Sequence, residues 1–193
     1  MAIQVNLAPF INEEFEVTGA WGEQRPGHIH AGIDLQTRRA YETDIGQPVY
    51  AMEDGIVTRV DQTDQGTGYG ALCIVWNTTN NDLWLYGDLG DNSVQVQVGD
   101  VITQGTQIGI EGDPTGTLSS GLHVHLEKEN QSDGIFKFGY ENSINPCIGT
   151  GINNLVDGTI YIYYGTPITF KKKKRFPWIL YAKKLRQKRR GLL

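Results

Sequence analysis

The sequence has little of several features that usually mark a protein's class or location. Among its 193 residues there are only two cysteines and four histidines. No apolar run approaches the roughly 18 residues that a membrane-spanning helix needs. The first ten residues, MAIQVNLAPF, lack the basic start and apolar stretch of a secretory signal peptide. The sequence therefore predicts neither a transmembrane helix nor a signal peptide, and action outside a cell would need another route of delivery.

Acidic residues are missing from the last part of the chain. All 22 of them lie at or before Asp157, whereas 11 of the 17 lysines and arginines lie from Lys171 onward. Residues 1–170 therefore carry a formal charge of 6 − 22 = −16, and residues 171–193 carry +11. Such a division marks the end of the chain as a separate docking or functional element.

The two cysteines, Cys73 and Cys147, permit a disulfide but do not require one. Nothing in their spacing demands a bridge, and a buried free cysteine is the commoner case. Both alternatives stay open at the level of sequence.

Glycine, in contrast, is abundant, with 24 residues. Short apolar stretches separated by glycine-containing turns follow one another between Phe15 and Pro146. Residues 71–76 are continuously apolar and predict a central strand, and the alternation of residues 94–98 predicts another strand. The pattern predicts a mainly β fold, an antiparallel sheet folded on itself. The predicted parts of the chain are an N-terminal arm (1–14), the main domain (15–147), an extension with one strand (148–170) and a basic tail (171–193).

All four histidines fall into two His-x-His pairs. His28 and His30 are followed by Asp34, and His123 and His125 lie about ninety residues later. Residues two positions apart in a strand point to the same face, so His123 and His125 can aim both imidazoles at one point. Two distant pairs that use every histidine, with a carboxylate beside one of them, predict a metal site assembled by the fold.

Several short segments around these pairs occur in a recognisable order. They are His30-Ala-Gly-Ile-Asp34, Gly46-Gln-Pro-Val-Tyr-Ala51, Gly55-Ile-Val57, Tyr69-Gly70, Val98-Gly-Asp-Val-Ile-Thr-Gln-Gly-Thr-Gln-Ile-Gly109, Thr115-Gly116 and Gly121-Leu-His-Val-His-Leu-Glu127. Together they resemble the lysostaphin/LytM-type zinc endopeptidases, which cut peptidoglycan cross-bridges. The resemblance covers roughly residues 15–146.

The resemblance implies a zinc ion bound by His30, Asp34 and His125, with His123 as a catalytic histidine. Three such ligands with an open fourth position suit hydrolysis, because zinc polarises a carbonyl and lowers the pKa of bound water. His123 would act as general base and then protonate the leaving amine. Glu127 is a candidate to orient a ligand from outside. The family fold also implies a groove walled by loops 61–70 and 111–120 and by segment 37–45.

The chain departs from the family at one catalytic position. The family has a second catalytic histidine in a Tyr-x-His-Leu segment, where this chain reads Tyr86-Gly87-Asp88-Leu89. An ionised carboxylate cannot donate a hydrogen bond to a developing oxyanion, and losing one such donor costs about 10²–10³ in rate. Asp88 could instead serve as a base or orient the water, or His28 could take the place of the missing histidine.

Three further residues are candidates to line the substrate groove: Tyr69, Tyr86 and His28. Aromatic residues on strands more often belong to a core, so this assignment of the tyrosines has a simple alternative. For His28 the alternative is a residue of the groove rim.

The basic tail mixes its cations with aromatic and aliphatic residues, and residues 178–190 could form a basic amphipathic helix. We expect the tail to dock onto an acidic protein partner, or to bind an anionic wall polymer or membrane surface. Nucleic acid is not expected as the main partner, because the −16 body would repel phosphate.

Two hypotheses for function follow from the resemblance. The first is a zinc-dependent endopeptidase that cleaves peptide cross-bridges of bacterial peptidoglycan. Since no signal peptide is predicted, it would be delivered by a phage particle, as a tail-tip component, or released as a lysin. The second is a catalytically weakened or silent, zinc-holding structural or wall-binding module of a phage tail or similar assembly. The intact set of predicted ligands favours the enzyme.

Overall fold

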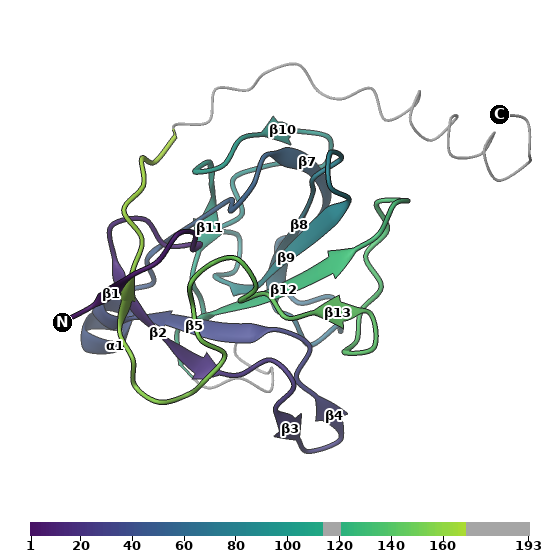
Figure 1. Ribbon diagram of the computed structural model, residues 1–193. Helices are drawn as coiled ribbons and strands as arrows, with labels where there is room; N and C mark the ends of the chain where they lie inside the picture. The colour runs from purple at the N-terminus through teal and green to yellow at the C-terminus, as the bar shows by residue number, and fades with distance from the viewer. Residues whose placement is uncertain (114–120, 169–193) are drawn as a thin grey trace, which may run out of the picture.

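The computed structural model describes residues 1–113 and 121–168 (Figure 1). A ten-stranded sheet has the strand order β1-β14-β2-β5-β12-β9-β8-β7-β10, and β13 also pairs with β12. Adjacent strands of this sheet are antiparallel, except for β1 and β14, which are parallel to each other. The predicted mainly β, antiparallel fold is confirmed. The basic tail 171–193, with its predicted helix at 178–190, lies outside the described residues.

The bounds of the elements are as follows. The large sheet contains β1 (Ile3–Gln4), β2 (Glu14–Gly19), β5 (Ile33–Thr37), β7 (Gly55–Asp61), β8 (Ala71–Trp76), β9 (Asp82–Leu89), β10 (Val101–Ile102), β12 (Val124–Asn130), β13 (Ser143–Ile144) and β14 (Tyr161–Ile162). Two further strand pairs are β3 (Gln24–Arg25) with β4 (His28–Ile29) and β6 (Pro48–Tyr50) with β11 (Gln107–Ile110). The helix α1 (Arg38–Thr43) follows β5 directly.

The strands β8 and β9 are buried on both faces, which explains the continuous apolar run of residues 71–76. Cys73, Val75, Trp84 and Tyr86 belong to the main core. Alternate residues on the opposite face form a second cluster, composed of Leu72, Ile74, Trp76, Leu83 and Leu85. Phe136 and Phe138, from the segment after β12, pack against this second cluster. Apolar residues therefore cover both faces of these two central strands.

The sheet extends beyond the boundaries 15–147 predicted for the main domain. The N-terminal segment 1–14 is not a free arm, because Val5, Ala8 and Phe10 are buried in the main core. Its strand β1 pairs with β14, and β14 pairs with β2. Hydrophobic burial therefore joins the arm and residues 148–168 to the same body.

The alternating segment 94–98 is not a strand, which corrects that prediction. Val94 and Val96 are buried and Gln95 is exposed, so the alternation reflects burial on one face. The backbone forms no ladder there, although the amide of Gln95 donates to the carbonyl oxygen of Ile108 at 2.8 Å.

Both cysteines are buried and free, so the disulfide is not formed. Burial raises the pKa of the Cys73 thiol above its ordinary range and raises that of Cys147 to about 11. Within the described ranges there is no helix with the length and apolar character needed to cross a membrane.

Candidate active site

The register of the central strands brings the two predicted metal-binding segments together. His125 on β12 pairs with Asp34 on β5 and, on the other side, with Gly87 on β9. His30 lies in the turn between β4 and β5. At Gly32 in this turn, a Cβ atom would lie 2.4 Å from the carbonyl oxygen of Leu126. Only glycine therefore lets the turn approach β12 closely enough to place His30 beside His125.

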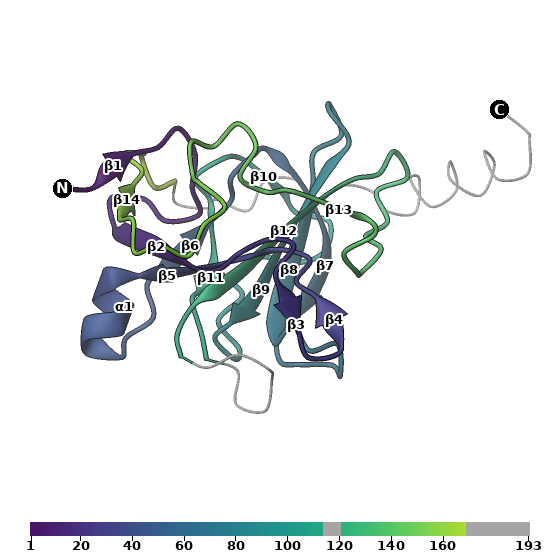
Figure 2. The same ribbon diagram turned by 60° about the horizontal axis from the view of Figure 1, so that its bottom comes forward.

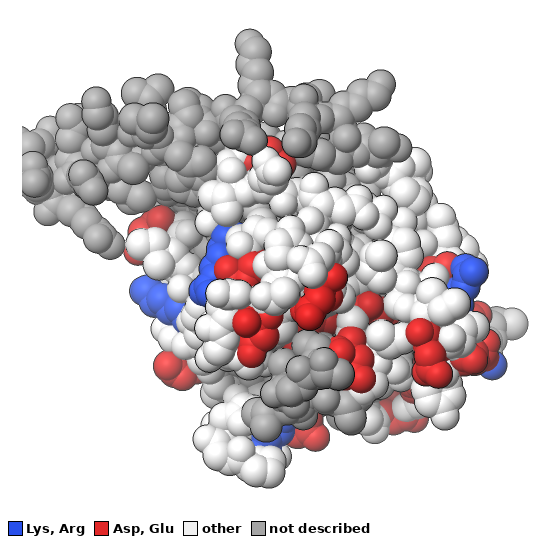
Figure 3. All heavy atoms as spheres, turned by 180° about the vertical axis from the view of Figure 1, so that it is seen from behind, with Lys and Arg blue, Asp and Glu red and all other residues white. Residues whose placement is uncertain are grey.

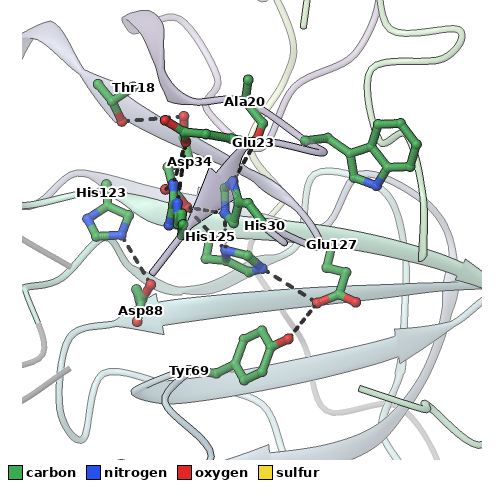
Figure 4. Close-up of polar contacts among 12 residues, drawn as sticks. Thr18, Ala20, Glu23, His30, Asp34, Tyr69, Asp88, His123, His125 and Glu127 are labelled. Carbon is green, nitrogen blue, oxygen red and sulfur yellow. Dashed lines mark hydrogen bonds and ion pairs between the residues drawn. The ribbon is translucent and has the colours of Figure 1, made fainter. Parts of the chain in front are cut away.

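Three buried acceptor atoms converge at one point (Figure 4). Nε2 of His30 lies 3.0 Å from Nδ1 of His125. Oδ1 of Asp34 lies 3.2 Å from the first nitrogen and 3.1 Å from the second. The structure thus brings together all three residues predicted as metal ligands.

The outer nitrogens of the two imidazoles each face an oxygen, but only Nδ1 of His30 is hydrogen-bonded, whereas Nε2 of His125 lies at ion-pair distance from a carboxylate. Nδ1 of His30 lies 2.8 Å from the carbonyl oxygen of Ala20, which can only accept a hydrogen bond. Nε2 of His125 lies 3.5 Å from Oε2 of the fully buried Glu127, which also accepts from the hydroxyl of Tyr69 at 3.0 Å. These contacts place the protons on the outer nitrogens and turn the inner lone pairs toward the shared point.

The electrostatics of this cluster favour a cation. Burial lowers the pKa of His125, but hydrogen bonds and charges from Asp34 and Glu127 outweigh it and raise that pKa to about 10. Burial raises the pKa of Asp34, yet its hydrogen bonds with His125 and His30 hold the pKa well below its usual range. A metal ion and a proton compete for the same imidazole lone pair, so a site that attracts one also attracts the other.

The donor set fits a zinc ion. Nitrogen and oxygen ligands at about 2.0–2.2 Å from a tetrahedral Zn²⁺ lie roughly 3.3–3.6 Å from one another, close to the spacing found here. Two imidazoles and one carboxylate leave a fourth position for water or substrate. His30, Asp34 and His125 could therefore hold the ion.

Asp88 and His123 form a pair beside this cluster. Nε2 of His123 lies 3.1 Å from Oδ2 of Asp88, and its Nδ1 lies 2.8 Å from the carbonyl oxygen of Gly121. Ligand atoms of Asp88 and His123 also lie within 4.8 Å of one of Asp34. The two predicted catalytic residues thus adjoin the candidate metal site.

A bulge in β9 aims Asp88 at the site. Ala71 pairs with Leu89 and Cys73 with Tyr86, so Gly87 and Asp88 together face one residue of β8. Asp88 has a φ of 53°, a left-handed conformation that aspartate tolerates better than most residues. Its other oxygen, Oδ1, is buried without a hydrogen-bond partner.

A cavity of about 630 Å³ opens onto these residues. Its lining comprises Arg25, His28, Ile29, His30, Ala31, Thr67, Gly68, Tyr69, Asp88, His125, Phe138, Gly139, Tyr140 and Glu141. The predicted groove residue Tyr69 and part of loop 61–70 therefore line it. His28 is exposed and lies on its rim, consistent with the simpler of its two interpretations.

Two groove predictions are wrong. Tyr86 is fully buried in the core, where its hydroxyl accepts from the amide of Met52 at 2.8 Å. Most of segment 37–45 belongs to α1, at the end of the molecule away from the β3–β4 hairpin, and the segment lines no part of the cavity (Figure 2). Most of the predicted wall 111–120, with Thr115-Gly116, lies outside the described residues.

Two parts of the cavity were missed at the level of sequence. Arg25 precedes the first histidine pair, and residues 138–141 follow β12. Nothing in their local pattern distinguishes them, although Phe138 and Tyr140 are aromatic residues in a glycine-rich stretch.

Comparison with known proteins identifies the family. The profile of peptidase family M23 matches residues 28–136. The chain belongs to this family. The matched M23 segment contains all five residues of the two clusters just described. A search of curated protein sequences gives no match.

Several solved structures have a similar fold. The catalytic domain of lysostaphin, an antimicrobial peptidase from Staphylococcus simulans, is 21% identical with a TM-score of 0.54, over 68% of this chain and 89% of that chain. The catalytic domain of the prophage-encoded M23 protein EnpA from Enterococcus faecalis, determined as a mutant, is 26% identical with a TM-score of 0.52, over 72% and 95%. A chain of the SpoIIIAH–SpoIIQ complex is 22% identical with a TM-score of 0.55, over 73% and 97%.

Proposed function

We propose that this M23 domain is a zinc-dependent endopeptidase that cleaves peptide cross-bridges of bacterial peptidoglycan. The observation that carries the proposal is the convergence of three lone pairs, from His30, Asp34 and His125, beside a proton-carrying pair and an open cavity. Membership of a peptidase family and the fold shared with lysostaphin support it.

Bound by these ligands, zinc would polarise the scissile carbonyl and lower the pKa of water. The Asp88–His123 pair would handle protons. The carbonyl oxygen of Gly121 can only accept, so Nδ1 of His123 carries the hydrogen of the neutral ring and Nε2 is then an acceptor. Since an ionised Asp88 is also an acceptor, their contact at 3.1 Å requires a proton between them. Burial lowers the pKa of His123, but the hydrogen bond with Asp88 and the charges of Asp34 and Asp88 outweigh it, and the net pKa is raised.

We therefore assign His123 as the acid that protonates the leaving amine. Asp88 lines the cavity, and its Oδ1 is buried without a hydrogen-bond partner, so this oxygen has the capacity to accept a hydrogen bond from the attacking water. Asp88 would thus orient the water and take its proton, rather than donate to an oxyanion, so that the pair again shares one proton after His123 has given its own to the amine. This use of Asp88 differs from that of the histidine that the resemblance places there.

A second candidate is a zinc-holding module of weak or no activity that grips wall peptide or has a structural role. The observation that favours it is Asp88 itself, which supplies an acceptor where the resemblance expects a donor. The two candidates differ in turnover and agree on metal binding.

For delivery we propose incorporation into a phage particle, as a tail-tip component, or release as a lysin, with the basic tail 171–193 docking onto an acidic protein or an anionic wall polymer. The description of EnpA as prophage-encoded supports a link to phage. The body offers little positive surface for anionic polymers, because residues 1–170 contain 22 acidic and 6 basic residues (Figure 3).

The deciding experiment measures release of peptide ends from purified cell walls. Wild type should release them, and chelator treatment or His123→Ala should abolish release, with zinc restoring the chelated sample. Asp88→His tests the second candidate, because a gain of about 10² in rate would indicate a crippled natural site. No release by wild type with any divalent metal would overturn the enzyme proposal.

A further inference from the structure

The two carboxylate oxygens of Asp34 face different partners. Oδ1 faces the ring nitrogens of His30 and His125 at 3.2 and 3.1 Å. Oδ2 accepts a hydrogen bond from Nη2 of Arg25 at 2.6 Å. A carboxylate can bind a metal ion through one oxygen or through both. The guanidinium occupies the oxygen that would complete two-oxygen binding.

Several features of the chain hold Arg25 in this position. Its Nε and Nη2 donate to Oε2 of Glu23 at 3.3 and 3.1 Å, so the guanidinium bridges two carboxylates. The backbone around it is fixed by pairing of Arg25 with His28 across the β3–β4 hairpin. On β2, a Cβ atom at Gly19 would lie 2.2 Å from Oδ2 of Asp34 and 2.3 Å from Nη2 of Arg25. The space for this ion pair therefore exists because residue 19 has no side chain.

The charges around the site also indicate a role for Arg25. Asp34 and Asp88 are both buried carboxylates, and Asp88 and Arg25 line the same cavity. Arg25 forms an ion pair with Asp34 at 2.6 Å. Without Arg25, one oxygen of Asp34 would lose its partner beside the ion.

We propose that Arg25 is a positioning residue that keeps Asp34 a one-oxygen ligand. By holding Oδ2, it prevents the carboxylate from turning both oxygens toward the metal and so keeps one coordination position free for water or a substrate carbonyl. The inference rests on the proposed metal centre, but it requires no contact between Arg25 and substrate.

The test compares full-length Arg25→Gln with wild type and with Arg38→Gln, an exposed arginine on α1 that pairs with Glu42. Each protein is loaded with Zn²⁺ or Co²⁺, and its coordination is read from X-ray absorption at the zinc edge and from the visible spectrum of Co²⁺. Far-UV circular dichroism and thermal unfolding establish that each variant is folded. Arg25→Lys, which keeps the charge, and Glu23→Gln, which frees one side of the guanidinium, provide two further variants should Arg25→Gln not fold.

We expect Arg25→Gln to gain one oxygen ligand at zinc, to lose intensity in the Co²⁺ spectrum and to lose about 10-fold or more in kcat/KM. Arg25→Lys should recover part of each property, because lysine supplies the charge as a single point rather than a fork. Arg38→Gln should match wild type. Unchanged coordination in Arg25→Gln, or in Arg25→Lys if Arg25→Gln does not fold, would overturn the inference.

The outcomes separate this inference from the proposed function. A wild-type protein that binds zinc with Arg25-dependent coordination but cleaves no peptidoglycan would sustain the inference and overturn the enzyme. A wild-type protein that cleaves while Arg25→Gln keeps the same coordination would do the reverse. A wild-type protein that binds neither Zn²⁺ nor Co²⁺ would overturn both.

Discussion

Nε2 of His123 and Oδ2 of Asp88 lie 3.1 Å apart. Nδ1 of His123 faces the carbonyl oxygen of Gly121 and holds the hydrogen of the neutral ring, so a hydrogen lies between His123 and Asp88 only when one of them is protonated. The backbone of His123 forms an isolated β-bridge with Gly112, and Asp88 lies in the bulge of β9. The pair is therefore held by two separate segments of backbone. We therefore expect a substitution in the pair to change its protonation rather than the positions of the two residues.

Asp88→Asn should remove the need for that proton. Asparagine tolerates the left-handed backbone and can donate its amide hydrogen to a neutral His123. The pKa of His123 should fall toward its ordinary value, and the rate should drop about 10²-fold at neutral pH, because the acid is no longer protonated. The measurement is the pH–rate profile, with zinc content as a control that should not change. An unchanged profile would mean that Asp88 does not set the protonation of His123.

Tyr69→Phe should weaken metal binding without disturbing the cavity wall. Phenylalanine keeps the ring contact with Phe138, whose centroid lies 5.2 Å away, but removes the hydrogen bond to Glu127. Because Glu127 orients His125, the zinc dissociation constant should rise about 10-fold, as outer partners of metal ligands typically contribute. Competition with a chromogenic chelator measures it. Tyr164→Phe, at an exposed tyrosine, is the matched control, and equal constants in the two variants would contradict the prediction.

Gly19→Ala should displace the pair formed by Arg25 and Asp34, since the new methyl group would overlap both side chains. We expect loss of zinc affinity by about 10-fold or more, together with destabilisation of about 1–3 kcal/mol from overpacking. Gly90→Ala is the control, because the nearest atoms to a Cβ there lie 3.6 Å away. Calorimetric titration and thermal unfolding report the two effects, and equal behaviour of both variants would count against the steric argument.

Glu129 should make folding stability depend on pH. Burial raises its pKa to about 7, although hydrogen bonds from the amide of Lys137 oppose the shift. As the pH rises from about 4.5 to 7, the unfolded chain releases this proton first, so the free energy of unfolding should fall. In Glu129→Gln this loss should be smaller by on the order of 2 kcal/mol.

Denaturant unfolding at pH 4.5 and 7.5, with chelator present in all samples, measures the difference. Glu16→Gln on β2 is the control and should follow wild type. Parallel pH dependence of wild type and Glu129→Gln would show that the buried carboxylate carries no such penalty.

The sequence predicted the features that depend on local pattern. The positions of His30, His123 and His125 and the apolar strand 71–76 follow from spacing or residue type, and the structure places them as expected. The ion pair of Arg25 with Asp34 could not be predicted from the sequence, because it depends on the pairing of β3 with β4 and on the absence of a side chain at Gly19. Tyr86 was misplaced for a similar reason: an aromatic residue has the same pattern on a core strand and on a groove wall. Packing between distant segments decides such cases.

Because β5 pairs with β12, a metal ion at the candidate centre would also stabilise the sheet. His30 and Asp34 lie about ninety residues before His125, so an ion held by all three would close a long loop of chain and fasten neighbouring strands. Such an ion would act as a removable cross-link in the middle of the sheet. At a free zinc concentration 100 times the dissociation constant, it would add about 2.7 kcal/mol to the stability of the fold. Exposure to a zinc-poor medium would then loosen β5 and β12, and β12 is the neighbour of β9, the strand that carries the Asp88 bulge.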